Sequence, residues 1–461
     1  MTWSHLFFGV LFVAAFESGC ARYRPLPLTS TPVTDRLQVP TDEVIKLKAS
    51  EIQHPLLRPL PIDGRDGLSP DEAAVVAVVA NPQLIAVRDQ RGLAAAQLLQ
   101  ARILPNPQLS ANLGVPAAGS TTGTVNAFGF GLDWNVRALL VRTALIDAAK
   151  RQAESIDLEI AWQEWQVAQA ARLQVFRVFF LEQQMAVARS EVEAFQRSLD
   201  LVRKALAAGY MTVMDLASAR AALQRSQVLL LAVDQQLVLE KLALNRALGF
   251  PPDRKVALQA NIEVPVITDL TDLPRIMNGL ESRRLDLVAF RLGYESQEAR
   301  LRAAVRGRFP AINLSLAQAR DTGNVVTAGS GLSIGLPFFD RNQGAIAFES
   351  ATRQQLFDEY TSRLFDARAV AAQILANARS LRDQIQAGEQ AVQSLQELVE
   401  TYRVALLEGS ADVLLYYNAR NELMAKQLDV VRLKQDLADQ SVALEIAAGA
   451  PLSSLGKRLT K

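Results

Sequence analysis

The stretch NPQLIAVR at residues 81–88 recurs as RLDLVAFR at residues 284–291, an offset of 203 positions. Farther along the chain the offset is 200, and the matched residues there are Gly209 and Gly409, Val213 and Val413, Ala219-Arg220 and Ala419-Arg420, Gly249 and Gly449, and Pro251 and Pro451. Two unrelated helical segments rarely keep their glycines and prolines in step over such a distance. The chain is therefore predicted to contain two copies of one unit, at residues 69–250 and 274–450.

Four further segments surround the two copies. Residues 1–20 are predicted to be a signal peptide, 21–68 a proline-rich tether with little helix, 251–273 a linker and 451–461 a C-terminal tail. Seven prolines fall in the tether, and prolines at this density favour an extended chain that runs over a surface.

The signal peptide ends in the only cysteine of the chain. Its apolar core, Leu6–Phe16, has the length of a signal-peptide core and is too short to cross a bilayer. Small residues precede Cys20, as in a bacterial lipobox, so we expect Cys20 to carry a lipid anchor. An ordinary secretory leader with an incidental cysteine is the alternative. In either case the chain leaves the cytoplasm.

Each copy is predicted to contain the same helices in the same order. A helix is followed by two strands, a very long helix, a glycine and a last helix. The predicted helices of the first copy are 69–103, 138–207 and 210–248, and those of the second copy are 274–306, 345–408 and 410–448. No glycine or proline interrupts 138–207, which makes a rod of roughly 105 Å. The two shorter helices, stacked end to end, would match that rod, as in the wall of a cylinder.

Apolar residues on the last helix of each copy recur every seven positions. They are Leu216, Leu223, Leu230, Leu237 and Leu244, and then Tyr416, Leu423, Val430, Leu437 and Leu444. A strict seven-residue repeat predicts left-handed coiled-coil packing between neighbouring helices. A periplasmic coiled-coil adaptor or scaffold would share this repeat, so it stays an alternative.

The predicted strands alternate between a large apolar face and a small polar face. The residues expected to face lipid are Phe128, Phe130, Leu132, Trp134, Leu314, Leu332, Ile334 and Leu336. This alternation is typical of an outer-membrane barrel, although a half-buried soluble sheet alternates equally well. Four strands cannot close a barrel, whose practical minimum is about eight, so three chains are expected to pool twelve strands.

The composition excludes several functional classes. The 461 residues include 49 Lys and Arg and 48 Asp and Glu, a net charge of +1, which argues against a nucleic-acid partner. One cysteine and two histidines, His5 and His54, cannot build a disulfide framework or a Cys/His metal cage. The sequence also contains no nucleophile elbow or phosphate loop. We therefore expect a protein that is not an enzyme and has no cofactor or resident metal.

In the order of these elements, the chain resembles the TolC-type outer-membrane efflux factors. The resemblance runs from about Leu68 to Pro451 and includes the turns GYMTVMD at 209–215 and GSADVLL at 409–415. It implies a homotrimer with a twelve-stranded barrel in the outer membrane, continuous with a periplasmic α-barrel. The expected fold is thus mainly α, with four strands per chain. A periplasmic membrane-fusion adaptor and an inner-membrane RND-type pump are the implied partners.

The same resemblance assigns the two turns to the periplasmic tip, where the tunnel narrows and the adaptor binds. The implied tip residues are Gly209, Asp215, Gly409, Asp412 and Asn418. Asp215 stands at the family's usual acidic position, and the alternative is a helix N-terminal carboxylate that counters the helix dipole.

The segment LPFFDRNQG at residues 336–344 resembles the CzcC-like branch, which serves heavy-metal efflux. We therefore expect a passive exit duct for heavy-metal cations. A duct for multidrug or protein export is the alternative within the family.

Overall fold

The computed structural model describes residues 23–63, 65–264, 273–408, 410 and 412–452. The chain divides into two compact units, 1–40 and 41–461. In the described part of the first unit, α2 (Ser30–Leu37) is the only helix. The second unit begins with α3 (Asp42–Ser50), whose first turn carries two acidic residues that favour a helix N-terminus. The tether at 21–68 is therefore more helical than predicted.

The helices of the first copy are α4 (Pro70–Ala80), α5 (Gln83–Arg102), α6 (Arg137–Ala207) and α7 (Val213–Leu248). Those of the second copy are α8 (Leu273–Met277), α9 (Leu280–Arg283), α10 (Leu285–Arg306), α11 (Gln343–Leu407) and α12 (Val413–Ala448). The long helices and the last helices agree closely with the predicted ranges.

The prediction of one unbroken helix over 69–103 is wrong, because the helix stops at Asn81. Proline disfavours the helical conformation in the residue before it, and Asn81 is extended with ψ 117°. The Asn81 side chain stabilises the break: Oδ1 accepts from the Gln83 N–H at 2.9 Å, and Nδ2 donates to the Ala247 carbonyl at 3.1 Å.

The predicted helix over 274–306 is also interrupted, and its last break, at Arg284, corresponds to Asn81. Arg284 is extended with ψ 114°, and its guanidinium binds Asp286. A glycine in the left-handed conformation lies against each break. A Cβ on Gly249 would lie 2.6 Å from Asn81 Cα, and one on Gly449 would lie 2.8 Å from Arg284 Cα. In both repeats, therefore, the glycine at the end of the last helix makes the same close backbone contact with the break in the first helix.

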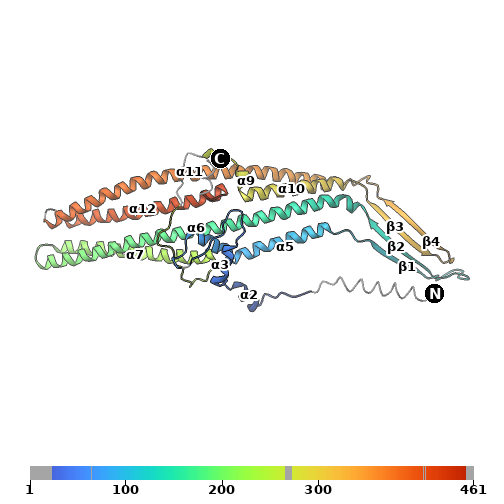
Figure 1. The fold of residues 1–461 in the computed structure, drawn as a ribbon, viewed down its shortest axis with the longest axis horizontal. Coiled ribbons are helices and arrows are strands. Elements are labelled where there is room, and N and C mark those ends of the chain that lie inside the picture. Colours follow the sequence, from blue (N-terminus) through green and yellow to red (C-terminus); the bar gives the residue numbers. More distant parts are fainter. Residues whose placement is uncertain (1–22, 64, 265–272, 409, 411, 453–461) are drawn as a thin grey trace. The chain divides into compact units, whose positions relative to one another are not determined.

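Four rods lie side by side in each half of the helical region (Figure 1). In one half the packed pairs are α5 with α6, α6 with α10, and α10 with α11. In the other half they are α7 with α6, α6 with α12, and α12 with α11. The long helices α6 and α11 run through both halves, as the length argument predicted. Among the described residues, no helix combines the length and the apolar character needed to cross a membrane.

The strands are β1 (Gln108–Gly114), β2 (Ala127–Asn135), β3 (Ile312–Arg320) and β4 (Val326–Ile334). They form one antiparallel sheet in the order β1-β2-β3-β4. Since α5 leads into β1, β2 into α6, α10 into β3 and β4 into α11, the lateral order of the strands matches that of the helices (Figure 1).

The main apolar core lies where α4, α7 and α12 pack against the middle of α6. Its buried members include Phe176, Leu181, Leu244, Leu248 and Val442. The linker joins this region through a parallel bridge between Leu68 and Leu258. A second apolar cluster lies near the ends of the two long hairpins and contains Phe195, Leu199, Val202, Leu223, Val413, Tyr416 and Tyr417.

Candidate functional site: an apolar sheet face and two helix tips

The register of the sheet gathers the predicted apolar residues on one face. Phe130 lies opposite Ala111, Leu132 opposite Leu109 and Leu316, and Leu314 opposite Leu332. Directly opposed residues point to the same side of a sheet, so these side chains form one surface. That surface is uncovered: Leu113 is 72% exposed and Leu332 61% exposed.

Two of the residues expected to face lipid differ from the others. Leu336 lies beyond the end of β4, because Gly335 makes the last backbone contact, to the Ala311 carbonyl, and Pro337 has no N–H with which to continue. The Trp134 ring is partly covered at the base of the sheet, and its Nε1–H donates to the Pro105 carbonyl at 2.9 Å. The distal half of β3 also puts Gln318 and Arg320 on the apolar face.

The opposite face of the sheet is lined by small and polar residues. A Cβ on Gly129 would lie 2.3 Å from Asn112 Oδ1, and one on Gly331 would lie 2.5 Å from Ser315 Oγ. The glycines therefore leave room for polar side chains of the neighbouring strand to lie flat across the sheet.

The first tip joins α6 to α7. Gly209 has a φ of +78°, and the Tyr210 N–H donates to the Ala205 carbonyl at 2.9 Å, which closes the end of α6. Thr212 and Asp215 form a reciprocal capping box: the Asp215 N–H donates to Thr212 Oγ1 at 3.2 Å, and the Thr212 N–H donates to Asp215 Oδ2 at 2.7 Å. Asp215 thus takes part in the cap at the start of α7.

The second tip joins α11 to α12, and Gly409, one of the predicted tip residues, lies outside the described residues. Asp412 is the N-cap of α12, and its Oδ1 accepts from the Leu414 N–H at 2.8 Å. Asp412 and Asn418 are exposed. The predicted acidic residues of both tips, Asp215 and Asp412, therefore accept backbone hydrogen bonds at the start of a helix.

A polar cluster that the sequence analysis missed lies behind the tips. Arg420 of α12 forms a two-bond ion pair with Glu191 of α6, with Nε–Oε2 2.9 Å and Nη2–Oε1 3.3 Å. Arg420 Nη1 also donates to the Tyr416 hydroxyl at 3.0 Å. The hydroxyls of Ser198 and Tyr417 lie 2.8 Å apart and add a second link between the same helices.

Burial shapes the electrostatics of this cluster. The Glu191 side chain is 8% exposed. Burial alone would lower the pKa of Arg420, but the hydrogen bond and charge of Glu191 raise it above its ordinary value. Burial also raises the pKa of Tyr417. Arg420 therefore stays charged and Tyr417 neutral near neutral pH. In the sequence, this polar cluster was indicated only by the matching arginines of the two repeats, Arg220 and Arg420.

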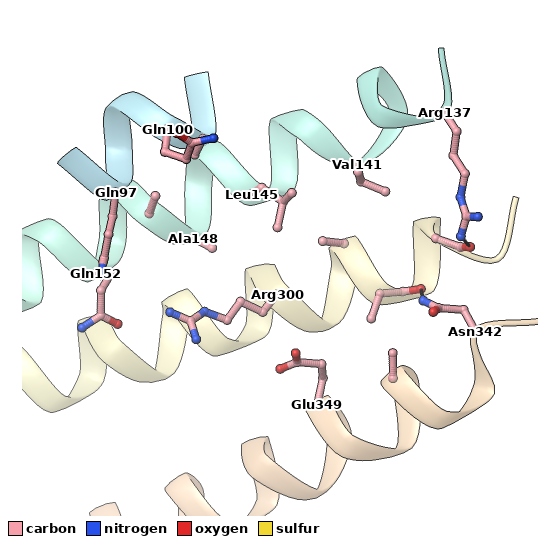
Figure 2. Close-up of a pocket in the computed structure, with 16 residues that line it drawn as sticks. Gln97, Gln100, Arg137, Val141, Leu145, Ala148, Gln152, Arg300, Asn342 and Glu349 are labelled. Atoms are coloured by element: carbon pink, nitrogen blue, oxygen red, sulfur yellow. Dashed lines mark hydrogen bonds between the residues drawn. The ribbon is translucent and has the colours of Figure 1, made fainter. Parts of the chain in front are cut away.

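A cavity of about 730 Å³ lies between α5, α6, α10 and α11, near the junction with the sheet (Figure 2). Its labelled polar side chains are Gln97, Gln100, Arg137, Gln152, Arg300, Asn342 and Glu349. Two of them bind backbone carbonyls, Arg137 that of Gly307 and Asn342 that of Ala304. Within the described parts of the chain, no three His, Cys, Asp or Glu residues are grouped so that they could hold a metal ion.

Comparison with known proteins gives the family. The family described as "Outer membrane efflux protein" matches residues 75–250 and 277–450. The cobalt-zinc-cadmium resistance protein CzcC of Cupriavidus metallidurans is 24% identical over 307 residues, which are 65% of this chain and 71% of CzcC. The probable outer membrane lipoprotein SilC of Salmonella typhimurium is 22% identical, over 58% of this chain and 60% of SilC.

A solved structure of CusC has the same fold, with a TM-score of 0.68 at 20% identity, over 87% of this chain and 98% of CusC. The CusC structures concern the conformational changes that accompany folding and transmembrane channel formation. Proteins of this family are passive channels of the outer membrane and not enzymes. With one family match in each repeat and this agreement in fold, the chain belongs to the outer membrane efflux protein family.

Proposed function

We propose that this chain is the outer-membrane channel of a tripartite efflux system and that it is a passive exit duct for heavy-metal cations. The observation that carries the proposal is the strand-by-strand continuity of an exposed apolar sheet with four long helices. An apolar sheet face of this kind suits lipid, and the helices extend the same wall into the periplasm. The names of CzcC and of the cation efflux protein CusC support heavy-metal cations as the substrate.

The functional state is proposed to be a homotrimer with a twelve-stranded barrel. In the described chain β1 and β4 each have one unpaired edge, and unpaired edges are not tolerated in a bilayer. The outer helices also leave large apolar side chains uncovered, including Leu93 and Leu99 on α5, Val228 and Leu231 on α7, and Phe348, Phe357 and Phe365 on α11. Neighbouring copies would pair the strand edges and cover these flanks.

The tips are proposed to be the adaptor contact and the gate, with Gly209, Asp215, Gly409, Asp412 and Asn418 as the residues involved. Large side chains are exposed next to the first turn: Tyr210 is 86% exposed and Met214 76% exposed. The adaptor would deliver cations from an inner-membrane RND-type pump, and selection among metals would lie in that pump.

Cys20, which lies outside the described residues, is proposed to carry a lipid anchor in the outer membrane. The small residues before it support this, as does the lipoprotein name of SilC. Mass spectrometry of the purified protein should show a diacylated or triacylated N-terminus. An unmodified cysteine in the mature chain would contradict the proposal, and Cys20→Ala should weaken sorting more than folding.

Deletion of the gene tests the channel proposal. Under metal stress the deletion strain should accumulate zinc, cobalt, cadmium or copper, measured by elemental analysis, and plasmid-borne wild type should reverse the accumulation. The wild-type protein should run as a heat-modifiable trimer from the outer-membrane fraction. Unchanged metal content together with new sensitivity to dyes and detergents would instead favour multidrug export.

A further inference from the structure

The chain between α3 and α4 crosses the helices as a strap, which we define as residues 51–62. Leu56 and Leu57 pack against the cluster that contains Trp162 and Trp165 of α6. Leu57 also joins a second cluster with Leu84 of α5. The strap therefore fastens the N-terminal part of the second unit to the helical repeats.

His54 is the buried polar centre of the strap, and its side chain is 1% exposed. The backbone N–H groups of Leu56 and Leu57 lie 3.0 and 3.1 Å from Nδ1, so Nδ1 must be an acceptor with a free lone pair. The Ala161 carbonyl lies 2.8 Å from Nε2, so Nε2 must carry the proton. These three partners together require the neutral imidazole in its Nε2–H tautomer.

Protonation would conflict with this arrangement, because the new proton on Nδ1 would face two N–H donors. The two charged groups that act on the ring are the Glu164 carboxylate and the Arg88 guanidinium. Glu164 of α6 has Oε2 3.9 Å from Nε2, but its Oε1 binds Arg88 of α5 at 2.6 Å. On the strap itself, Glu51 and Arg58 are exposed. The nearest carboxylate is therefore already shared with a cation and compensates only in part for a charged ring.

We propose that His54 is an acid-sensitive latch: its neutral ring holds the strap on α6, and its protonation releases the strap. Burial lowers the pKa of His54 below its ordinary value, against smaller opposing effects of the Ala161 carbonyl and Glu164. Because the pKa is lower in the folded than in the unfolded chain, the latch is fully effective above the unfolded value of about 6.5 and weakens as the pH falls below it. The latch does not depend on the proposed transport function.

Nuclear magnetic resonance of the purified full-length protein, with isotope-labelled histidine, tests the ring directly. We expect the Nε2–H tautomer at pH 7.5 and a midpoint below 6.5. His54→Gln, which removes the titratable ring, assigns the signal. Glu164→Gln should lower the midpoint further, because it removes the carboxylate that favours the charged ring.

A spin label at Gln53, attached through a ketone-bearing amino acid so that Cys20 is left unchanged, tests release. Its mobility should rise between pH 7.5 and pH 5.0 in the otherwise wild-type protein and show no pH transition with His54→Gln. A matched label at the exposed Arg189 of α6 should not respond. Constant mobility at Gln53 in the wild type, the same transition in His54→Gln, or an Nδ1–H tautomer at pH 7.5 would each overturn the latch.

Discussion

The two repeats place matched arginines in opposite environments. Arg420 of the second repeat is bound to Glu191 and Tyr416 across the α6–α12 seam, whereas Arg220 of the first repeat is exposed on α7. Duplication has kept the helical frame while the polar links have diverged. At the same offset of 200, the positions that match Glu191, Ser198, Tyr416 and Tyr417 are Ala391, Leu398, Leu216 and Ala217.

This difference indicates that the two kinds of seam at the tips have different chemistry. The seam inside one chain has an ion pair and hydroxyl contacts. Apart from Arg220, the residues that would form the equivalent seam with a neighbouring copy are apolar or small, so Arg220 has no matching carboxylate at the position of Glu191. In the proposed trimer we therefore expect the two hairpins of one chain to stay together more firmly than hairpins of different chains.

Arg420→Ala should give the largest difference between the repeats. It leaves the buried Glu191 carboxylate without its cation, which costs about 3 kcal/mol. The matched control Arg220→Ala removes an exposed side chain and should stay within about 0.5 kcal/mol of wild type. Denaturant unfolding followed by circular dichroism measures both. Equal losses would show that the ion pair does not distinguish the repeats.

Charge on the apolar sheet face should affect both repeats alike. Phe130→Arg in β2 and Leu332→Arg in β4 should each lose about 2–4 kcal/mol of stability in lipid. Ser333→Arg is the control, because Ser333 is adjacent to Leu332 and points to the opposite face. Refolding into lipid vesicles at graded denaturant provides the measurement. Similar tolerance at Leu332 and Ser333 would mean that the apolar face does not contact lipid.

Removal of the two helix caps should change stability by different but smaller amounts. Thr212 shares two reciprocal backbone bonds with Asp215, whereas Asp412 accepts a single one. Thr212→Ala should cost about 1 kcal/mol, and Asp412→Ala should lie nearer the low end of the range, at about 0.5 kcal/mol. Hydrogen exchange in the first turns of α7 and α12 resolves the two effects. If Asp412→Ala increased exchange in α12 more than Thr212→Ala does in α7, the expected order of the two caps would be wrong.

The turn glycines should influence transport more than stability. Gly209 has a positive φ, so Gly209→Val meets backbone strain of about 1 kcal/mol, whereas its Cβ would have no neighbouring atom within 4 Å. We expect Gly209→Val and Gly409→Val to impair metal efflux while the trimer and its membrane insertion stay intact. Gly92→Val, in the middle of α5 with open space, is the control and should transport normally. Normal efflux in both turn variants would show that the turns are not part of the gate.

Much of this fold can be predicted from local signals, and the errors have physical causes. Alternation and helix length identified the strands and rods, and Pro82 already indicates the break at Asn81. The matching break at Arg284 is followed by Leu285 and not by a proline, and the glycine that contacts it, Gly449, lies 165 positions away in the sequence. The Glu191–Arg420 pair spans 229 positions, so it requires the packed helices to be known.

The contact of Gly249 with Asn81 and of Gly449 with Arg284 has a consequence for the assembly of the channel. Each repeat makes this contact within itself, so the wall of the proposed trimer corresponds to six half-length units. Joining two repeats in one chain halves the number of molecules that must meet. Each association step costs several kcal/mol of translational and rotational freedom. The covalent linker between the repeats thus replaces part of the encounter entropy that separate half-length units would lose on assembly.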